Sequence, residues 1–405
     1  MRQPARFRTF CTICLLVIIC STSCKKSDNS PSSGNAANFP YTTEAVSQQK
    51  TDLSGECQTV SSSIQGMVNV NAISVLENFV NISGGSASQN AALIKPLLGI
   101  QTKNGNINNI AESVNVSKDT TLSLLFNSIK GTYTWNSTSK QFDSTKNTSG
   151  IVFIFPSKKN YTVNDAQLTI TYTGVTGIYP ISGYKGDIPK SFDITLTVAG
   201  TNVAEFNFNA SYTSSGIPSS INGFISLTPY KLEASWTYTT TTLALSFSFL
   251  NGSNTLMQFT GNNTGDFSKT TIDSATLVQS ILKTANATFQ FGNLAIAGNV
   301  NYADLGPKIP VVESGNNQDS IATREARLLN TDVSLILYYV SSNQKIASIV
   351  AYPVESFNGM STSWNVQLGF VFNDKSKGSF DSYYGNGFTN SLEKLFENIT
   401  VNSTN

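Results

Sequence analysis

Residues 204–212 read Ala-Glu-Phe-Asn-Phe-Asn-Ala-Ser-Tyr, a strict alternation of apolar and polar side chains. Successive side chains of a strand point to opposite faces of a sheet, so this stretch predicts a strand with one apolar and one polar face. Strand patterns recur at residues 168–172, 194–198, 243–249, 288–291, 294–300, 333–339, 346–352 and 366–372. The sequence therefore predicts a β-rich protein.

Two hairpins and a central strand are also expected. Asn251-Gly252 separates the alternating stretch 243–249 from residues 256–259, and an Asn-Gly pair in this position predicts a type I′ turn. Residues 131–136 and 140–142 predict a second hairpin. Ile151–Phe155 is apolar on both faces, which indicates a strand in the middle of a sheet.

Four stretches have helical periodicity instead. Val68–Ile82 is apolar almost all round, which predicts a deeply buried helix. Asp119–Ile129 and Asp319–Leu329 predict shorter helices. Phe388–Ile399 carries an apolar stripe with charged residues opposite, so a C-terminal amphipathic helix is expected.

Many strands with few intervening helices predict one large antiparallel sheet. So many strands in one sheet must curl or close. We therefore expect a β-rich α+β fold, half-barrel-like, with a few helices covering its concave face. The alternative is two β-sandwiches divided near Gly261–Lys269. The chain shows no clear repeat or linker, which favours a single domain over residues 51–405.

The first 23 residues predict a signal peptide. Three arginines among the first eight residues precede an apolar run from Phe10 to Cys20. Small residues and a cysteine follow, in Ser21-Thr22-Ser23-Cys24. This is the order of a secretory signal, and the apolar run is too short for a permanent membrane-spanning helix.

The segment Ser21–Cys24 resembles the bacterial lipobox, in which a peptidase cuts before a cysteine that carries the lipid. With Lys25-Lys26-Ser27-Asp28 after it, the segment is similar to lipoproteins of the Bacteroidota. The resemblance implies lipidation (palmitate) at Cys24 and an outer-membrane lipoprotein that faces the periplasm or the cell surface. Residues 24–50, rich in Ser, Asn, Gln and Lys, are then expected to be a flexible tether.

The composition excludes several kinds of chemistry. The chain has no histidine, which excludes Ser-His-Asp and Cys-His catalytic sites and every histidine-bearing metal site. Its acidic residues form no recognisable catalytic pair, and it has no calcium-loop or phosphate-loop motif. We therefore expect no enzyme and no cofactor. After the signal segment the chain has only two arginines, Arg324 and Arg327. Such a low arginine content argues against a nucleic-acid partner.

The cysteines leave a single free thiol. Three of the five lie in residues 1–23, and Cys24 would carry the lipid. Cys57 then has no partner for a disulfide in the mature monomer. Without a histidine to activate it, Cys57 is expected to be a small buried side chain.

The expected function is non-catalytic binding of an apolar or lipidic ligand by a membrane-anchored envelope lipoprotein. A half-barrel covered by helices resembles bacterial carriers of lipids and lipoproteins, and this implies a cavity lined by Phe and Leu. The alternative is a cell-surface lipoprotein that binds a glycan or a protein. Its candidate aromatic residues are Trp135, Trp236, Trp364 and the loop Phe380–Phe388.

Four triplets match the Bacteroidota O-glycosylation pattern of Asp, then Ser or Thr, then a small aliphatic residue or Thr. They are Asp119-Thr120-Thr121, Asp143-Ser144-Thr145, Asp273-Ser274-Ala275 and Asp319-Ser320-Ile321. The expected modification sites are Thr120, Ser144, Ser274 and Ser320.

Overall fold

The computed structural model describes residues 38–67, 69–84, 122–175, 187–214, 216–268, 271, 281–313, 318–357, 362–379 and 383. These residues form 16 strands and five helices. The chain divides into two compact units. Unit 1 comprises residues 1–63 and 234–391, and unit 2 comprises residues 64–233 and 392–405. Strand β8 (Tyr230–Tyr238) contains the division between them.

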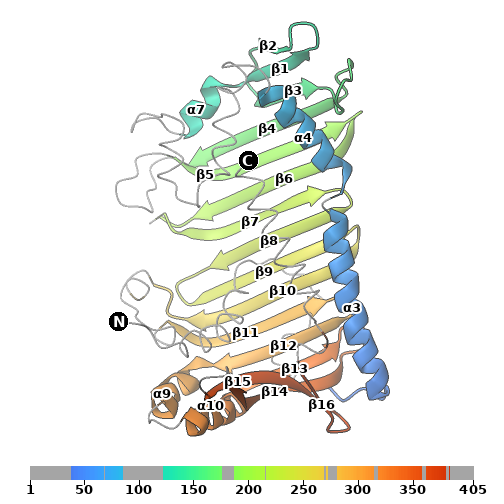
Figure 1. Cartoon of the computed structure of the whole chain (residues 1–405). Helices are drawn as coiled ribbons and strands as arrows, with labels where there is room; N and C mark the ends of the chain where they lie inside the picture. Colours follow the sequence, from blue (N-terminus) through green and yellow to red (C-terminus); the bar gives the residue numbers. More distant parts are fainter. Residues whose placement is uncertain are drawn as a thin grey trace. The chain divides into compact units, whose positions relative to one another are not determined.

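Unit 2 is built on a mixed sheet of seven strands before β8 (Figure 1). They are β1 (Gly131–Asn136), β2 (Gln141–Thr145), β3 (Ile151–Phe155), β4 (Ala166–Val175), β5 (Ile188–Val198), β6 (Thr201–Tyr212) and β7 (Pro218–Leu227). The strands pair in the order β2-β1-β3-β4-β5-β6-β7. Every pairing is antiparallel except that of β1 with β3, which is parallel.

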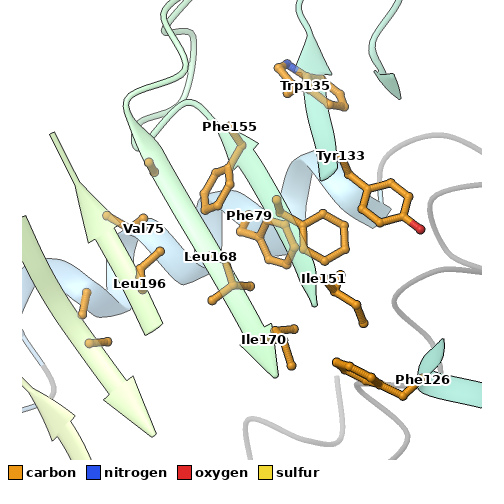
Figure 2. Close-up of a cluster of buried hydrophobic side chains, with 14 residues drawn as sticks. Val75, Phe79, Phe126, Tyr133, Trp135, Ile151, Phe155, Leu168, Ile170 and Leu196 are labelled. Atoms are coloured by element: carbon orange, nitrogen blue, oxygen red, sulfur yellow. The ribbon is translucent and has the colours of Figure 1, made fainter. Parts of the chain in front are cut away.

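Helices α4 (Asn71–Gly84) and α7 (Leu122–Ser128) pack on one face of this sheet. Val75 and Phe79 of α4 share a buried cluster with Phe153, Phe155 and other alternate residues of β1 and β3–β6 (Figure 2). The ring centroids of Phe79 and Phe155 lie 4.8 Å apart. Because alternate strand residues point to one face, the period of two in the sequence supplies this cluster directly.

The burial of α4 differs from the prediction for Val68–Ile82. Ala72, Val75 and Phe79 are buried, but Val80 is 45% exposed. A helix lying on a sheet buries one face only, so apolar residues on its far side stay in solvent. The helix therefore has one buried and one exposed face, although its sequence is apolar almost all round.

Unit 1 is built on eight antiparallel strands after β8, paired in sequence order. They are β9 (Thr242–Asn251), β10 (Asn254–Gly265), β11 (Leu282–Phe291), β12 (Leu294–Asn301), β13 (Val333–Tyr339), β14 (Gln344–Phe357), β15 (Thr362–Phe372) and β16 (Lys377–Ser379). Its helices are α9 (Tyr302–Glu313) and α10 (Gln318–Asp332), which connect β12 to β13, and α3 (Val46–Met67), whose residues up to Ser63 belong to this unit.

Two small clusters attach α9 and α10 to the sheet of unit 1. Ala322, Ala326 and Leu329 of α10 pack against Ala351 of β14 and Val366 of β15. Tyr302 and Leu305 begin α9 in a second cluster with residues of β11 and β12. The small alanines let α10 lie close to the strands, as helix–sheet packing requires.

The prediction of a β-rich chain with a large sheet and a few helices is confirmed. Within each unit the described strands form one sheet, so the alternative of two β-sandwiches is wrong. The pairing of β1 with β3 makes the sheet mixed rather than purely antiparallel. Curling into a half-barrel, helices on a concave face and a single domain over residues 51–405 stay predictions.

The turn after β9 is a two-residue hairpin, as predicted, but of another type. Asn251 pairs with Asn254, so Gly252 and Ser253 are the central residues. Gly252 has a positive φ of 58° and Ser253 does not. A positive φ at the first central position alone is typical of type II′, so the predicted type I′ turn is wrong.

Helix α3 and the segment before it differ from the tether predicted for residues 24–50. Residues 38–50 hold defined positions: Phe39 stacks edge-on against Tyr338, with ring centroids 5.1 Å apart, and Tyr41 forms a parallel bridge with Lys345. The signal that was missed is the buried stripe of α3, which consists of Leu53, Cys57, Val60, Ile64 and Met67. Its steps of four and three are helical. The predicted helix Phe388–Ile399 lies outside the described residues.

Candidate functional site

A row of partly exposed apolar side chains extends across β5, β6 and β7 of unit 2. We call it the apolar row, and its members are Phe192, Phe206, Phe208, Ile221 and Ile225. The strand register places Phe192 opposite Phe208 and Phe206 opposite Ile225. The alternation along β5 and β6 puts these residues on the same face as Leu196 and Ala204, which belong to the core under α4.

Most of this row lies outside the core under α4 and α7. The core cluster under α4 and α7 includes Phe192 only as a partly buried neighbour and excludes the other four members. Ile225 is 43% exposed. The rings of Phe192 and Phe206 meet edge-to-face, with centroids 5.8 Å apart. The row is therefore an apolar surface that continues the core beyond the end of its described cover.

The row lacks a side chain at Gly223. This glycine lies opposite Phe208 and between Ile221 and Ile225 on β7, where a Cβ would strike the backbone carbonyl of Asn207. The members of the row offer no charge and no hydrogen-bonding side chain. Such a surface can bind only by removing apolar area from water, which suits an acyl chain or an apolar side chain.

The opposite face of the same strands is polar. Asp193 of β5 accepts hydrogen bonds from Thr171 of β4, at 3.3 Å, and from the amide of Asn207 of β6. Asn209 donates to Asn207 at 2.8 Å, which continues the chain of hydrogen bonds along β6. Phe224 of β7 lies opposite Asn207 on this face. The face thus combines hydrogen-bonding groups with one aromatic ring.

Asp187 forms a buried polar cluster next to α7. Its carboxylate is fully buried and accepts hydrogen bonds from the backbone N–H and hydroxyl of Ser123 and, at 2.8 Å, from the hydroxyl of Tyr172. Burial raises the pKa of Asp187, but these hydrogen bonds outweigh burial and leave the pKa below its usual value. Gly174 lies close to this carboxylate, and the Cβ of any other residue at position 174 would strike it. The cluster therefore attaches the start of α7 to the sheet.

Unit 1 contains a polar pocket of about 630 Å³ between α3 and the ends of β12–β14. Three acids of α3 and its approach line it, Glu44, Asp52 and Glu56, with Tyr339 opposite. The hydroxyl oxygen of Tyr339 lies 2.6 Å from Oε2 of Glu44 and 2.6 Å from Oδ2 of Asp52. Glu56 accepts a hydrogen bond at 3.1 Å from the backbone N–H of Asn293, in the turn between β11 and β12.

The structure places only some of the predicted modification sites. Ser144 is exposed on β2, which pairs only with β1 among the described strands. Ser320 lies in the first turn of α10, but the structure does not describe its side chain. Cys24, Thr120 and Ser274 lie outside the described residues.

The aromatic residues proposed for a glycan are largely packed against other residues where the structure describes them. Trp135 is buried in the core of unit 2, and Trp364 packs against the cluster under α10. Trp236 is half-buried on β8. Of the loop Phe380–Phe388, only Tyr383 is described, and its ring contacts Phe370 and Phe372. The residues of the apolar row and Phe224 were not singled out by the sequence, although their alternation was visible in it.

Cys57 is buried, as expected for a lone cysteine in this chain. Burial and the neighbouring charge of Glu56 raise the pKa of its thiol to about 12. Such a thiol stays protonated near neutral pH and is a poor nucleophile.

Two features are absent from the described part of the chain. No helix within it has the length and apolar character needed to cross a membrane. Across the same residues, no group of three or more Asp, Glu, Cys or His side chains is arranged to hold a metal ion.

Comparison with known proteins adds little. No protein-family model matches the chain, and no curated protein matches it significantly. Among solved structures, a porin-like protein from Bacteroides vulgatus is similar over 52% of this chain and 94% of its own length, with 12% identity. The TM-score is 0.18, so this likeness supports no conclusion about fold or function.

Proposed function

We propose that this protein is a lipoprotein of the bacterial outer membrane, anchored through Cys24, that binds the acyl chains of a lipid on the apolar row without catalysing a reaction. One observation carries the proposal: five apolar side chains of β5–β7 continue the core of unit 2 but remain half-exposed. Soluble proteins seldom leave a contiguous apolar surface without a use for it.

The free energy gained by burying a single acyl chain is small, which favours a lipid with more than one chain. Burying about ten methylene groups contributes about 8 kcal/mol at about 0.8 kcal/mol each. Association costs at least about 4 kcal/mol, which leaves about 4 kcal/mol, or a Kd of about 1 mM. A second chain, or a partial cover, is needed for a micromolar Kd, so phospholipids and other acylated molecules are better candidates than single fatty acids.

The proposed anchor would make a weak site useful. A lipid on Cys24 holds the protein at the membrane surface, where the local concentration of acyl chains is high. The experiment for this part is detergent partitioning of the Cys24→Ser variant. We expect the variant to be exported but to lose its membrane association. A variant that stays in the detergent phase would contradict the anchor.

The experiment for the ligand is native mass spectrometry of the protein purified from its own host. Retained lipid, in addition to the mass of the anchor, supports the proposal. A matched pair of variants locates the site: Ile225→Glu places a charge in the apolar row, and Asn222→Glu places one on the opposite face of the same strand. We expect the first variant to lose the lipid and the second to keep it.

The polar face supports a second candidate, a glycan ligand. Phe224 lies opposite Asn207, whose side chain is hydrogen-bonded to Asp193, and sugars combine ring stacking with such polar contacts. The ammonium group of Lys231 lies 4.1 Å from the centroid of the Phe224 ring and would have to move aside. Binding of a bacterial polysaccharide that is lost in Phe224→Ala and kept in Ile225→Glu would favour this candidate over the lipid.

A further inference from the structure

Residues 156–165, which connect β3 to β4 at one end of the sheet of unit 2, expose two large apolar side chains. We call this segment the β3–β4 loop. Tyr161 is 47% exposed and Val163 is 67% exposed, and neither belongs to the core cluster of the unit. They are two of the five large apolar side chains that are exposed among the described residues. A single exposed apolar residue is ordinary, but two in one short loop form an apolar surface of the kind that marks a contact site.

Two lysines precede these residues in the same loop. Lys158 and Lys159 are exposed, and neither ammonium group forms an ion pair with a described residue. The ammonium group of Lys158 lies 5.4 Å from the centroid of the Tyr161 ring, so a cation and an aromatic ring share one surface. Tyrosine and lysine both suit the boundary between water and lipid, because each combines an apolar body with a polar end.

A third lysine lies at the same end of the sheet. β1 and β3 are parallel, so the connections that follow them leave the sheet at one end. Lys140, in the turn after β1, is exposed. The side-chain amide of Asn164 in the β3–β4 loop donates a 2.8 Å hydrogen bond to the backbone carbonyl of Trp135, near the end of β1. This bond ties the loop to the strand that carries the turn.

The acids of the loop and of the β1–β2 hairpin are engaged by neighbouring groups. Asp165 accepts hydrogen bonds from the backbone N–H of Ser157, at 2.7 Å, and from its hydroxyl, at 2.8 Å. Asp143 of β2 accepts a 3.0 Å hydrogen bond from the side-chain amide of Asn136. The three exposed lysines outnumber these two acids, so the loop and the neighbouring turn carry an excess of positive charge.

Hydrogen bonds also hold both ends of the β3–β4 loop. The carbonyl of Pro156 accepts the amide of Asn78 at 2.7 Å, and the carbonyl of Asp165 accepts the backbone N–H of Ala199 at 2.7 Å. Together with the bonds between Ser157 and Asp165, they order the loop before any partner arrives. An ordered loop loses little conformational entropy on binding, so even a small contact contributes to affinity.

We propose that the β3–β4 loop is a membrane contact that docks on the surface of a bilayer containing anionic lipids. Val163 and the ring of Tyr161 enter the boundary between headgroups and acyl chains, and Lys158 and Lys159 lie against the lipid phosphates. A bilayer surface offers an apolar layer directly beneath a layer of negative charge, which is the pairing that this loop presents. An acidic protein or polysaccharide matches the lysines but gives the exposed valine no apolar layer to enter.

The contact is separate from the apolar row and requires neither a lipid on Cys24 nor a lipid bound to β5–β7. In a protein that also carries the proposed anchor, it supplies the second of the two signals that stable membrane attachment usually takes.

Sedimentation with lipid vesicles tests the contact. The protein is the purified full chain with Cys24→Ser, so that no lipid anchor contributes, and all variants share this background. The vesicles are phosphatidylcholine alone or phosphatidylcholine mixed with phosphatidylglycerol. We expect the Cys24→Ser protein to prefer the anionic vesicles. Lys158→Gln with Lys159→Gln should lower the partition coefficient on anionic vesicles about 30-fold, or about fivefold for each lysine, and should change that on neutral vesicles little.

The apolar half of the contact has its own variant. Tyr161→Ser with Val163→Ser should lower the partition coefficient on both kinds of vesicle by at least about fivefold, because it removes the side chains that enter the lipid. Both positions are exposed, so the fold should persist, and thermal unfolding of the variant checks this.

Matched controls lie at the opposite end of the same strands. Lys130 directly precedes β1, and Lys190 lies near the start of β5. Lys130→Gln with Lys190→Gln removes the same charge there and should change the partition coefficient less than about twofold. Leu124 of α7, which is 58% exposed, gives the apolar control Leu124→Ser, which should bind vesicles as its parent does.

Two results would overturn the inference. One is equal binding of the Cys24→Ser protein to neutral and anionic vesicles. The other is a loss in the control pair of lysines as large as that in the loop pair. Ile225→Glu separates this contact from lipid binding on the apolar row: vesicle binding that is lost in Ile225→Glu and kept in the loop variants would place the contact on the row instead. Vesicle binding that is lost in the loop variants and kept in Ile225→Glu supports the loop, whether or not the row holds a lipid.

Discussion

The side-chain amide of Asn78, buried in α4, donates a 2.7 Å hydrogen bond to the backbone carbonyl of Pro156, just after β3. The residues are 78 positions apart, so this bond fixes α4 along the sheet of unit 2. It is a polar contact within an otherwise apolar interface, and it gives the helix a defined register that apolar packing alone does not impose.

Replacing Asn78 with Ala should therefore destabilise unit 2 by about 1–3 kcal/mol, because the carbonyl of Pro156 loses its partner in a buried place. The measurement is the free energy of unfolding from a denaturant titration. Asn69→Ala is the control, since the amide of Asn69 bonds the carbonyl of Gln65 at 3.2 Å in solvent. The control should change stability by less than about 0.5 kcal/mol. Equal effects in the two variants would show that the buried bond is unimportant.

Phe79 and Val80 provide an adjacent pair with opposite environments. Phe79 is 6% exposed and touches Phe142, Phe153 and Phe155 through its ring. Phe79→Ala should cost about 3–5 kcal/mol through lost burial and a cavity. Val80→Ala, at a largely exposed position, should cost under about 0.5 kcal/mol. The same denaturant titration checks both, and a large loss in Val80→Ala would contradict the placement of α4.

Asp187 should make the stability of unit 2 sensitive to acid. Its pKa in the folded state is lowered, so the stabilisation is present above the unfolded pKa of about 3.9 and is lost as the pH falls through the lower folded pKa. Thermal unfolding measured between about pH 6 and about pH 3 should show this loss in the wild type. Asp187→Asn should be less stable at neutral pH and lose less on acidification. A parallel loss in both proteins would rule out Asp187 as a source.

Ser144 is the predicted O-glycosylation site whose exposure the structure describes. It lies on β2, and its neighbour Asp143 is also exposed. If the native host modifies this triplet, Ser144→Ala should lower the intact mass of the native protein by the mass of one glycan. Ser139→Ala, in the turn between β1 and β2, should leave the mass unchanged apart from the substitution. A wild-type mass that contains only the lipid would contradict glycosylation.

The alternation of residues predicted most of the strands because it acts locally. The pattern of 204–212 became β6, and Ile151–Phe155 became β3, paired on both sides as expected. The parallel pairing of β1 with β3 could not be seen in the same way. It depends on which edge of a hairpin the next strand joins, and that choice is made by tertiary packing rather than by periodicity.

The candidate sites depended even more on the tertiary structure. The apolar row was visible as alternating residues, but its exposure depends on where α4 and α7 end on the sheet, which no residue pattern states. The contact between Glu44 and Tyr339 in the polar pocket of unit 1 joins residues 295 positions apart. The stripe of α3 from Leu53 to Met67 was within reach of helical periodicity, but the polar composition of residues 24–50 concealed how early the folded part begins.

The most direct test of lipid binding uses a fluorescent two-chain phospholipid and the pair Ile225→Glu and Asn222→Glu. These substitutions add the same charge to β7 on opposite faces, so they separate the apolar row from a general effect of charge. We predict that the wild type and Asn222→Glu bind the phospholipid with similar Kd values. Ile225→Glu should raise the Kd at least about tenfold, because an ion in the row prevents the burial of acyl chains. Equal Kd values for all three proteins, or no binding by the wild type, would contradict the proposed function.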